Sequence, residues 1–338
     1  MKGDLHEALE RYLRLQWPHA SGLQVINLSR IRGGYSRKIW SLDAVWEEDG
    51  QRYSQGMVLR PSYSTLFTGT PFTLEREVRI MQSLKGSPIP VPAVLWYETD
   101  PGWLGEPFAI IERVKGQADF VFPSEAEKEQ VIDRFVELLA IQHRLDWEKL
   151  GLSFLGVPKD ASDCALQQVL VWERAIRENL LEPLPIVTEV ISWLKRHAPP
   201  GVSRVSLNQG DVGPGNFLFD GGEITAVLDW ENAFLGDPMA DLGYLTLWRG
   251  PALGDLGRLF ARYEKVSGIP VRPESIQYYT LFGLLFGLGT GLVVRRKFCT
   301  GEAEDAIAGL LLGVRATEFQ QALACDQLLK ARGVEEGG

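Results

Sequence analysis

The spacing of apolar residues in the first third of the chain is typical of β-strands interrupted by one helix. Several segments are enriched in β-branched and aromatic residues and are separated by Gly-Gly and Glu-Asp-Gly turn signals. The predicted strands span residues 23–28, 39–46, 53–59, 93–97 and 108–114. Between the third and fourth strands, Leu74, Val78 and Met81 recur at helical spacing before a run of prolines. This pattern predicts an antiparallel sheet with one helix, residues 72–84, packed against it.

Beyond residue 116 the apolar spacing becomes helical. Ser124 followed by Glu127 is a capping box, and a stripe of apolar residues continues from it toward His143. Further helices are predicted over residues 161–180, 185–197, 241–248, 255–267, 274–294 and 302–332. The chain is therefore of the α+β class, with a predicted N-terminal lobe of residues 1–114, a C-terminal lobe of residues 115–338 and a hinge at about 111–116.

One uncharged segment, residues 275–294, resembles a membrane span in composition. Its strongly apolar part, residues 281–294, is shorter than the ~20 residues that a spanning helix needs. The glycines of Gly287-Leu-Gly-Thr-Gly291 imitate a dinucleotide fingerprint but follow no predicted strand. The segment predicts a buried core helix.

The composition of the chain argues against some classes of binding partner. The chain has 338 residues, 45% of them hydrophobic, and a formal net charge of −9. An acidic globular protein is not expected to bind nucleic acid or an anionic membrane surface. Three widely spaced cysteines fit neither a disulfide framework nor a zinc site, which favours the cytoplasm, and the N-terminal residues predict an amphipathic helix rather than a signal peptide. Composition is silent on oligomeric state.

The side chains best suited to chemistry lie in residues 208–242. Asp211 and Asn216 are five residues apart on a loop punctuated by Gly and Pro, and Asp229 follows a strand-like run. Mg²⁺ prefers oxygen ligands, and a carboxylate with an amide oxygen can supply them. A second carboxylate facing a hydroxyl completes the set needed for phosphoryl transfer. The alternative is an acidic β-hairpin with Asp220-Gly221-Gly222 as its turn and merely solvated carboxylates.

This segment resembles the aminoglycoside phosphotransferase and choline-kinase family, which is related to the protein kinases. The matching pieces are Gly210-Asp211, Pro214-Gly215-Asn216, Leu228-Asp229-Trp230-Glu231, Gly236-Asp237-Pro238 and Asp241-Leu242. Gln209 stands where the family usually has His, and Gln also donates and accepts hydrogen bonds. The resemblance implies a bilobal protein-kinase-like fold that uses ATP and Mg²⁺. It makes Asp211 the residue that positions the acceptor hydroxyl and makes Asn216 and Asp229 the metal ligands.

The resemblance also implies a nucleotide site in the N-terminal lobe. Gly33, Gly34 and Ser36 form a turn between two predicted strands that can close over phosphates, although Arg37 replaces the family's Asn. Arg60 occupies the position of the basic residue that holds the α- and β-phosphates. The V-L-R pattern around it is similar to kinase domains fused to acyl-CoA dehydrogenases.

Three further roles follow from the same resemblance. Glu77, or Glu75 as the fallback, is expected to pair with Arg60. Main-chain groups of Glu112 and Val114 are expected to bind adenine. Other supporting residues are His143, expected to pack in the core, and Asp237 and Asp241, expected to anchor the catalytic loop through main-chain hydrogen bonds.

The expected function is the phosphorylation of a hydroxyl on a small molecule. From Asp241 onward the chain has eleven acidic and eleven basic residues, a balance that favours a weakly charged alcohol over a polycationic aminoglycoside. The dehydrogenase-linked branch implies a hydroxyacyl compound, while macrolide, homoserine-like and sugar hydroxyls stay open. The alternative is a catalytically weak pseudokinase or nucleotide-binding regulator, suggested by Gln209, Arg37 and Arg60. A protein kinase is disfavoured because too few residues separate Trp230 from Gly236 for an activation loop.

Overall fold

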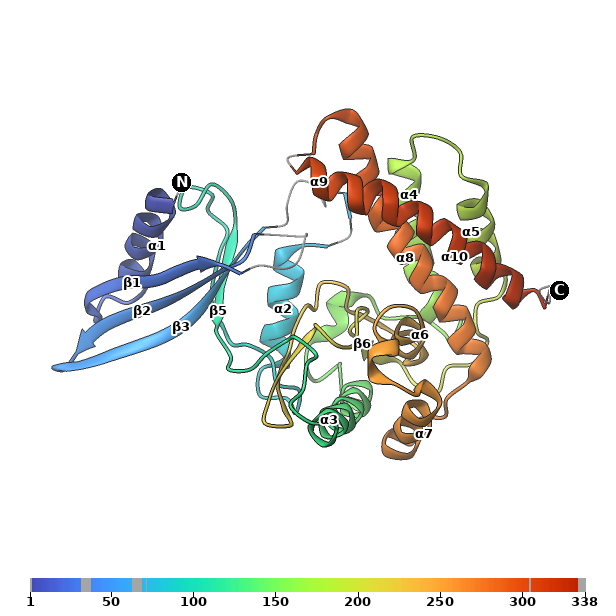
Figure 1. Ribbon diagram of the computed structural model, residues 1–338, viewed down its shortest axis with the longest axis horizontal. Coiled ribbons are helices and arrows are strands. Elements are labelled where there is room, and N and C mark those ends of the chain that lie inside the picture. The colour runs from blue at the N-terminus through green and yellow to red at the C-terminus, as the bar shows by residue number, and fades with distance from the viewer. Residues whose placement is uncertain (1, 32–37, 63–68, 71, 304, 334–338) are drawn as a thin grey trace.

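A five-stranded antiparallel sheet forms one side of the molecule, and helices form most of the other (Figure 1). The computed structural model describes residues 2–31, 38–62, 69, 70, 72–303 and 305–333. The strand order is β1-β2-β3-β5-β4, and every neighbouring pair is antiparallel. The strands are β1 (Ser21–Arg30), β2 (Trp40–Glu48), β3 (Gln51–Pro61), β4 (Val94–Glu98) and β5 (Phe108–Glu112).

Two helices cover opposite faces of this sheet. Successive side chains of a strand point to opposite faces, and β5 shows the division. Phe108 and Ile110 pack with α1 (Lys2–Gln16), whereas Ala109 and Ile111 pack with α2 (Leu74–Leu84). The packed helix that the sequence predicts is α2. The predicted N-terminal amphipathic helix is α1, and it lies on the other face, where it closes a second apolar layer.

The C-terminal part is mainly helical and carries four short strands. The helices are α3 (Glu125–Arg144), α4 (Asp163–Asn179), α5 (Pro185–Arg196), α6 (Met239–Leu247), α7 (Leu256–Ser267), α8 (Pro273–Thr300), α9 (Ala306–Ala308) and α10 (Ala316–Ala331), with short helical turns η2 (Leu152–Leu155), η3 (Gly250–Leu253) and η4 (Gly309–Arg315). The strands form two antiparallel pairs, β6 (Ser206–Asn208) with β9 (Phe234–Gly236) and β7 (Phe217–Asp220) with β8 (Glu223–Val227). The fold is the protein-kinase-like α+β arrangement that the sequence predicts.

The uncharged segment lies within α8, at the centre of the helical part (Figure 1). Within the described ranges, α8 is the one helix whose length and composition would suit a membrane span, and 72% of its most apolar window is buried inside the protein. Leu281, Leu284, Leu288 and Val293 have no exposed surface. The prediction of a core helix is confirmed, because neighbouring helices bury the apolar length of α8.

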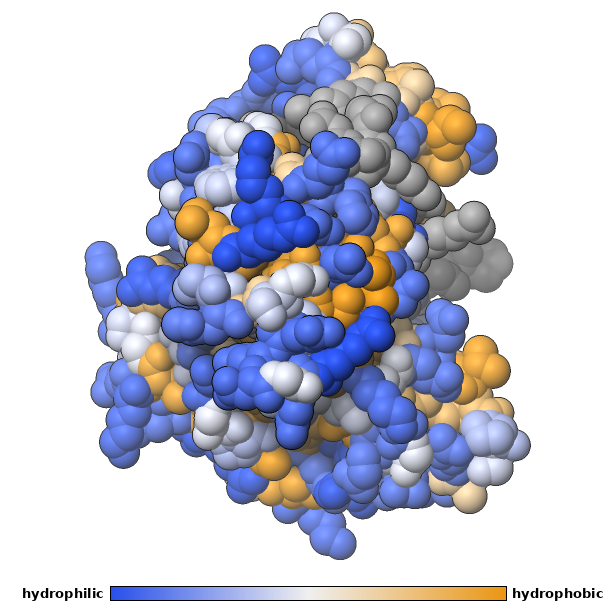
Figure 2. All heavy atoms as spheres, turned by 90° about the vertical axis from the view of Figure 1, so that its left-hand side faces the viewer, coloured by the Kyte–Doolittle hydropathy of each residue, from blue (hydrophilic) through white to orange (hydrophobic). Residues whose placement is uncertain are grey.

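The outer end of the molecule, formed by α1 and the sheet, is mostly hydrophilic (Figure 2). Apolar side chains appear between the polar ones (Figure 2). Leu15 of α1 and Tyr53 of β3 are exposed to solvent. The apolar positions of the strands instead point inward to the layers described above. This end therefore presents a solvated surface, as expected of a sheet that is covered on both faces.

The three thiols are predicted to differ sharply in reactivity. Cys164 is buried and burial raises the pKa of its thiol to about 12, whereas Cys299 and Cys325 are exposed. The thiolate is the reactive form of cysteine. A disulfide reagent should therefore modify the exposed Cys299 and Cys325 rapidly in the native protein, and the buried Cys164 only after denaturation. Time-resolved thiol titration with and without denaturant measures this, and rapid modification of Cys164 in the native protein would contradict the prediction.

Candidate active site

The loop between β6 and β7 and the turn after β8 bring the predicted chemical side chains together. Asp211, Asn216 and Asp229 line one cavity of about 560 Å³. The main-chain N–H of Leu228 donates to the carbonyl oxygen of Asn216 at 2.8 Å, so the hairpin ties the metal candidates to each other. The three residues that the sequence places in order along the chain are thus neighbours around one opening.

Asp211 is held by Arg249, which lies just after α6. Arg249 Nε donates to Asp211 Oδ1 at 2.7 Å, and Arg249 Nη2 donates to Asp211 Oδ2 at 2.8 Å. Arg249 Nη1 donates to the carbonyl oxygen of Pro214 at 2.6 Å. Such a two-pronged contact fixes the plane of the carboxylate as well as its position. One guanidinium therefore fastens both the carboxylate and the main chain of the loop.

The surroundings of this ion pair are partly buried. Burial disfavours the charged form of Arg249, but the hydrogen bonds and charge of Asp211, together with the charge of Asp229, outweigh it and raise the pKa of the arginine. Burial also raises the pKa of Tyr244 well above its ordinary value, and the charge and hydrogen bond of Asp211 add to this. Tyr244 thus keeps its proton and donates to Asp211.

Two glycines of the loop are required by the position of Arg249. Gly213 and Gly215 adopt φ angles of 126° and 94°, in the region that favours glycine. A Cβ atom on Gly213 would lie 2.8 Å from Arg249 Cβ, and one on Gly215 would lie 2.8 Å from Arg249 Nη1. The Val-Gly-Pro-Gly sequence after Asp211 therefore allows the arginine to lie flat against the loop.

The predicted metal ligands offer oxygen atoms. Asn216 Nδ2 donates to the carbonyl oxygen of Asp211 at 2.6 Å, which leaves the amide oxygen as the atom available to a cation. Asp229 has φ 54°, a left-handed conformation that few residues other than Gly, Asn and Asp adopt. Its side chain is 39% exposed. Left-handed backbone at a site residue is a common sign of a geometry held for function.

Arg60 links the sheet to this site. Arg60 Nη2 donates to Glu77 Oε1 at 2.5 Å and to Asp229 Oδ1 at 3.0 Å. Arg60 is 5% exposed and Glu77 is fully buried. The predicted pairing of Arg60 with Glu77 is confirmed, and the contact with Asp229 was not predicted. Arg60 therefore joins β3, α2 and the catalytic hairpin.

A buried polar network supports the start of the loop between β6 and β7. Asp241 Oδ2 accepts from the main-chain N–H of Gln209 at 3.0 Å, and Asp241 Oδ1 accepts from that of Gly210 at 2.9 Å. The fully buried His143 contacts Asp241 Oδ2 through Nε2 at 3.1 Å and the Tyr263 hydroxyl through Nδ1 at 2.6 Å. The predictions that Asp241 anchors the loop and that His143 is a packing residue are confirmed.

The prediction for Asp237 is wrong. Its carboxylate accepts from the main-chain N–H of Met239 at 3.1 Å and from Arg272 Nη2 at 2.5 Å. These partners lie at the start of α6 and just before α8, so Asp237 caps α6 instead of anchoring the catalytic loop. The short spacing from Asp237 to α6 explains this, because its side chain reaches the first free N–H groups of that helix.

Gln209, at the position where the family usually has His, links the catalytic loop to the end of the hairpin through its side chain. Gln209 Nε2 donates to the carbonyl oxygen of Leu228 at 2.6 Å, next to Asp229. We predict that Gln209→Ala destabilises the fold by about 1–3 kcal/mol, because the partly buried Leu228 carbonyl then loses this donor. Chemical denaturation measures the change. The matched variant Gln24→Ala, at an exposed strand position, should change stability by less than about 0.5 kcal/mol, and equal effects of the two variants would contradict the role of this link.

The remaining nucleotide predictions have different outcomes. Gly33, Gly34 and Ser36 lie outside the described residues. Glu112 is exposed at the end of β5, and Val114 is half-buried two residues later. Neither is among the described residues that line the 560 Å³ cavity. Their predicted contacts with adenine stay predictions.

Sequence reasoning missed Arg249 and Tyr244. Both lie in or just after an apolar helix, in the segment Asp-Leu-Gly-Tyr-Leu-Thr-Leu-Trp-Arg. The signal present in the sequence was a single arginine ending an otherwise uncharged run that starts from Asp241. Such a position is usually a solvated helix end, so only the folded chain shows that Arg249 turns back to Asp211.

Comparisons with known proteins identify a family and several sequence relatives. The sequence profile of the phosphotransferase enzyme family matches residues 40–274. Acyl-CoA dehydrogenase family member 11 of Rattus norvegicus is 28% identical over 281 residues, and family member 10 of Mus musculus is 29% identical over 284. The matches cover 80% and 81% of this chain but 35% and 25% of those proteins. The chain thus spans about a third or less of the length of these relatives.

Solved structures show the same fold. A crystal structure of a candidate aminoglycoside phosphotransferase from Ralstonia eutropha matches with a TM-score of 0.68 and 25% identity, over 96% of this chain and 98% of that one. Aminoglycoside phosphotransferase APH(4)-Ia, in a ternary complex with ADP and hygromycin B, matches with a TM-score of 0.63 and 18% identity, over 98% of this chain and 100% of that one. The observed architecture is therefore shared along nearly the whole length of both proteins.

Proposed function

Because the chain belongs to the phosphotransferase enzyme family, we propose that it transfers a phosphoryl group from ATP, with Mg²⁺, to a hydroxyl of a small molecule. The observation that carries this proposal is the convergence of Asp211, Asn216 and Asp229 on one cavity. We place the reaction in the cytoplasm, where three free thiols are stable.

The residues present fit a magnesium ion. Asp229 and Asn216 offer a carboxylate and an amide oxygen, and Mg²⁺ commonly takes one or two protein carboxylates with substrate phosphates completing its shell. When bound, the ion supplies positive charge that stabilises the phosphate oxygens. Asp211 orients the acceptor hydroxyl toward the phosphate and accepts its proton. Since Arg249 donates to both oxygens of its carboxylate, its orientation is fixed before the acceptor arrives.

The nucleotide is proposed to lie between the sheet and the hairpin, with residues 1–114 and 115–338 as the two lobes. In this proposal Arg60 contacts its phosphates, and the hydrogen bond of Arg60 to Glu77 supports this by fixing the guanidinium. The fold neighbour APH(4)-Ia was crystallised with ADP and with AMP-PNP, which supports ATP as the donor. Gly33, Gly34 and Ser36 over the phosphates, and the main chain of Glu112 and Val114 at adenine, complete the proposal.

The acceptor is proposed to be a weakly charged alcohol, with a hydroxyacyl compound favoured over an aminoglycoside. Among the residues that the structure describes, three carboxylates line the cavity: Asp211, Asp229 and Glu231. Two of them already pair with arginines, Asp211 with Arg249 and Asp229 with Arg60. Little negative charge is left to hold a polycation, and an uncharged alcohol needs none. The sequence relationship to acyl-CoA dehydrogenase family members supports a hydroxyacyl acceptor.

A screen of nucleotide consumption tests the proposal. The purified chain is incubated with ATP and Mg²⁺ and with hydroxyacyl-CoAs, hydroxy acids, amino alcohols, sugars and aminoglycosides in parallel, and phosphorylated products are identified by ³¹P NMR. We expect a phosphate ester from an uncharged or hydroxyacyl alcohol. A product formed only from aminoglycosides would overturn the acceptor class.

A second candidate function is a catalytically weak pseudokinase that binds nucleotide to regulate something else. The observation that favours it is the bidentate contact of Arg249, which engages both oxygens of Asp211. Under this reading the protein binds ATP and Mg²⁺ in calorimetry but phosphorylates none of the alcohols and hydrolyses ATP no faster than the Asp211→Asn variant. Product formation in the same screen excludes it.

A further inference from the structure

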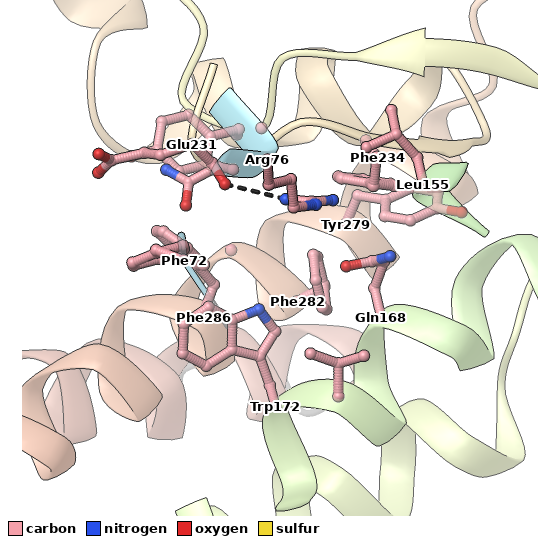
Figure 3. Close-up of a pocket in the computed structure, with 16 residues that line it drawn as sticks. Phe72, Arg76, Leu155, Gln168, Trp172, Glu231, Phe234, Tyr279, Phe282 and Phe286 are labelled. Carbon is pink, nitrogen blue, oxygen red and sulfur yellow. Dashed lines mark hydrogen bonds between the residues drawn. The ribbon is translucent and has the colours of Figure 1, made fainter. Parts of the chain in front are cut away.

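A second cavity of about 230 Å³ lies beside the catalytic one, and aromatic rings form a large part of its lining (Figure 3). Its aromatic residues come from α4, α6, α8, β9 and the segment before α2: Phe72, Trp172, Phe234, Tyr244, Tyr279, Phe282 and Phe286. Trp172 packs edge-on against Phe286, with ring centroids 4.9 Å apart, and against Phe72 at 5.7 Å. These mutual contacts fix the rings of one wall, so the cavity is already formed without an occupant.

The two cavities share a wall. Phe72, Glu231, Asn232, Tyr244 and Phe286 line both of them. Helix α8 runs past both, with Gly283 facing the aromatic cavity and Gly287, about one turn later, facing the catalytic one. A molecule whose hydroxyl reaches Asp211 can therefore extend directly into the aromatic cavity.

The size of the aromatic cavity limits what fits. An apolar protein cavity of about 150 Å³ accommodates benzene. The present cavity is larger, at about 230 Å³, and its lining is mostly apolar. It suits a compact hydrocarbon group somewhat larger than a benzene ring, such as a phenylalkyl or branched alkyl group. Burying such a group contributes about 25 cal/mol for each Å² of apolar surface removed from water.

The arginine at the edge of the cavity, Arg76, forms hydrogen bonds with main-chain carbonyl oxygens of the protein. Arg76 donates to the main-chain carbonyl of Glu231 at 3.0 Å and to that of Ala233. The Glu231 carboxylate points away from Arg76 and from the ring-lined space (Figure 3). A group that enters the space therefore meets rings and engaged donors, which favours an uncharged group over an ionised one.

Asn232 adds a polar feature at the junction of the two cavities. Its Oδ1 is buried and has no hydrogen-bond partner in the part of the chain that the structure describes. A buried acceptor without a partner costs about 1–3 kcal/mol, so a donor on the ligand would be stabilised here. The junction is thus suited to a second hydroxyl or an N–H group next to the apolar group.

We propose that the aromatic cavity is a specificity subsite for the acceptor, which takes an uncharged compact apolar group and bonds an adjacent donor through Asn232. This inference rests on the proposed function for the position of the reacting hydroxyl. It narrows the acceptor to alcohols whose apolar portion lies within a few bonds of that hydroxyl.

Binding is tested separately from phosphoryl transfer. Saturation-transfer NMR with the ATP·Mg²⁺-loaded full chain compares 3-phenyl-1-propanol, 3-phenyl-1,2-propanediol and glycerol. The same three alcohols are then assayed as phosphate acceptors by ³¹P NMR. We expect both phenyl compounds to bind more tightly than glycerol and the diol to bind more tightly than the mono-alcohol. A diol no tighter than the mono-alcohol would refute the role of Asn232.

A matched pair of glycine variants locates the binding. Gly283→Ala and Gly287→Ala each add one methyl group to α8, one toward each cavity, and each new Cβ first meets the flexible end of a side chain, Leu247 Cδ1 or Gln320 Nε2. Gly283→Leu extends the series and also favours the helix by about 1 kcal/mol. We expect Gly283→Leu to weaken binding of the phenyl compounds about tenfold or more, Gly283→Ala to weaken it less, and Gly287→Ala to leave the ratio between phenyl compounds and glycerol unchanged.

The outcomes separate the subsite from the reaction. Equal binding of the phenyl compounds to the native chain and to Gly283→Leu, with both folded by circular dichroism, would overturn the subsite. Tight binding that Gly283→Leu abolishes, without any phosphorylated product, would support the subsite and refute the proposed function. Phosphorylation of glycerol but not of the phenyl alcohols would uphold the function and overturn the subsite.

Discussion

Replacing Asp211 with Asn is expected to lower turnover by about 10²–10⁴-fold, the usual contribution of a residue that handles the proton in the transition state. Asn keeps the shape of the side chain but cannot accept the proton of the acceptor hydroxyl. Binding of ATP·Mg²⁺ should change little, because the proposed ligands are Asn216 and Asp229. Steady-state kinetics give the turnover, and calorimetry gives the nucleotide affinity.

Two controls accompany this variant: its thermal stability and a carboxylate variant outside the catalytic cavity. Asp211→Asn also weakens the ion pair with Arg249, so the melting temperature of each variant must be measured alongside its kinetics. Asp133→Asn, which removes a carboxylate from a surface ion pair with Arg262, should keep full activity. Turnover equal to that of the native chain in folded Asp211→Asn would remove Asp211 from the mechanism.

Changing Arg249 is expected to give the second large loss. Arg249→Met removes the charge and the fork that hold Asp211 and Pro214, and a displacement of about 1 Å at a reacting group can lower turnover by about 10²-fold. Arg249→Lys keeps the charge but cannot form the two-pronged contact, so it should recover only part of the activity. The loss should appear in kcat, with the KM for ATP nearly constant.

A double-mutant cycle tests whether Arg249 acts through Asp211. If it positions that carboxylate, Arg249→Met should cost much less in the Asp211→Asn background than in the native chain, because groups that act as a unit are strongly non-additive. Additive losses would show that Arg249 acts on some other group. Higher activity in Arg249→Met than in the native chain would show that the arginine suppresses Asp211, as the pseudokinase reading requires.

The sequence predicted the fold and its elements closely. Most predicted strands and helices match those observed because hydrophobic periodicity is a local signal: the strand at residues 108–114 is β5, and the helix at residues 274–294 is the core of α8. The exception is the single helix predicted at residues 302–332, which the structure divides into α9, η4 and α10. The ion pair of Arg60 with Glu77 was predicted from family order alone, and so was the anchoring role of Asp241. The roles of the candidate residues in binding nucleotide and metal stay predictions.

What the sequence could not supply depends on contacts between distant segments. Arg249 reaches Asp211 across 38 positions, and the aromatic cavity gathers rings from five segments. Asp237 was misassigned for a related reason: its motif position is fixed, but the choice between capping α6 and anchoring the loop depends on the direction of its side chain. Apolar periodicity marks Trp172 and Phe286 as core residues, and only the packing shows that they leave a space between them.

The two ion pairs of Arg60 have a consequence for how the molecule opens. A single guanidinium nitrogen touches Glu77, behind the sheet, and Asp229, at the end of the catalytic hairpin. This contact bridges the proposed lobes at the place where a triphosphate is proposed to enter. If the proposed nucleotide and cation bind there, they would compete with this contact, and we expect ligand occupancy to be coupled to the relative position of the proposed lobes. Apolar packing and the Arg76 hydrogen bonds also join the proposed lobes, and Arg60 adds to them a buried charge that a bound nucleotide would meet directly.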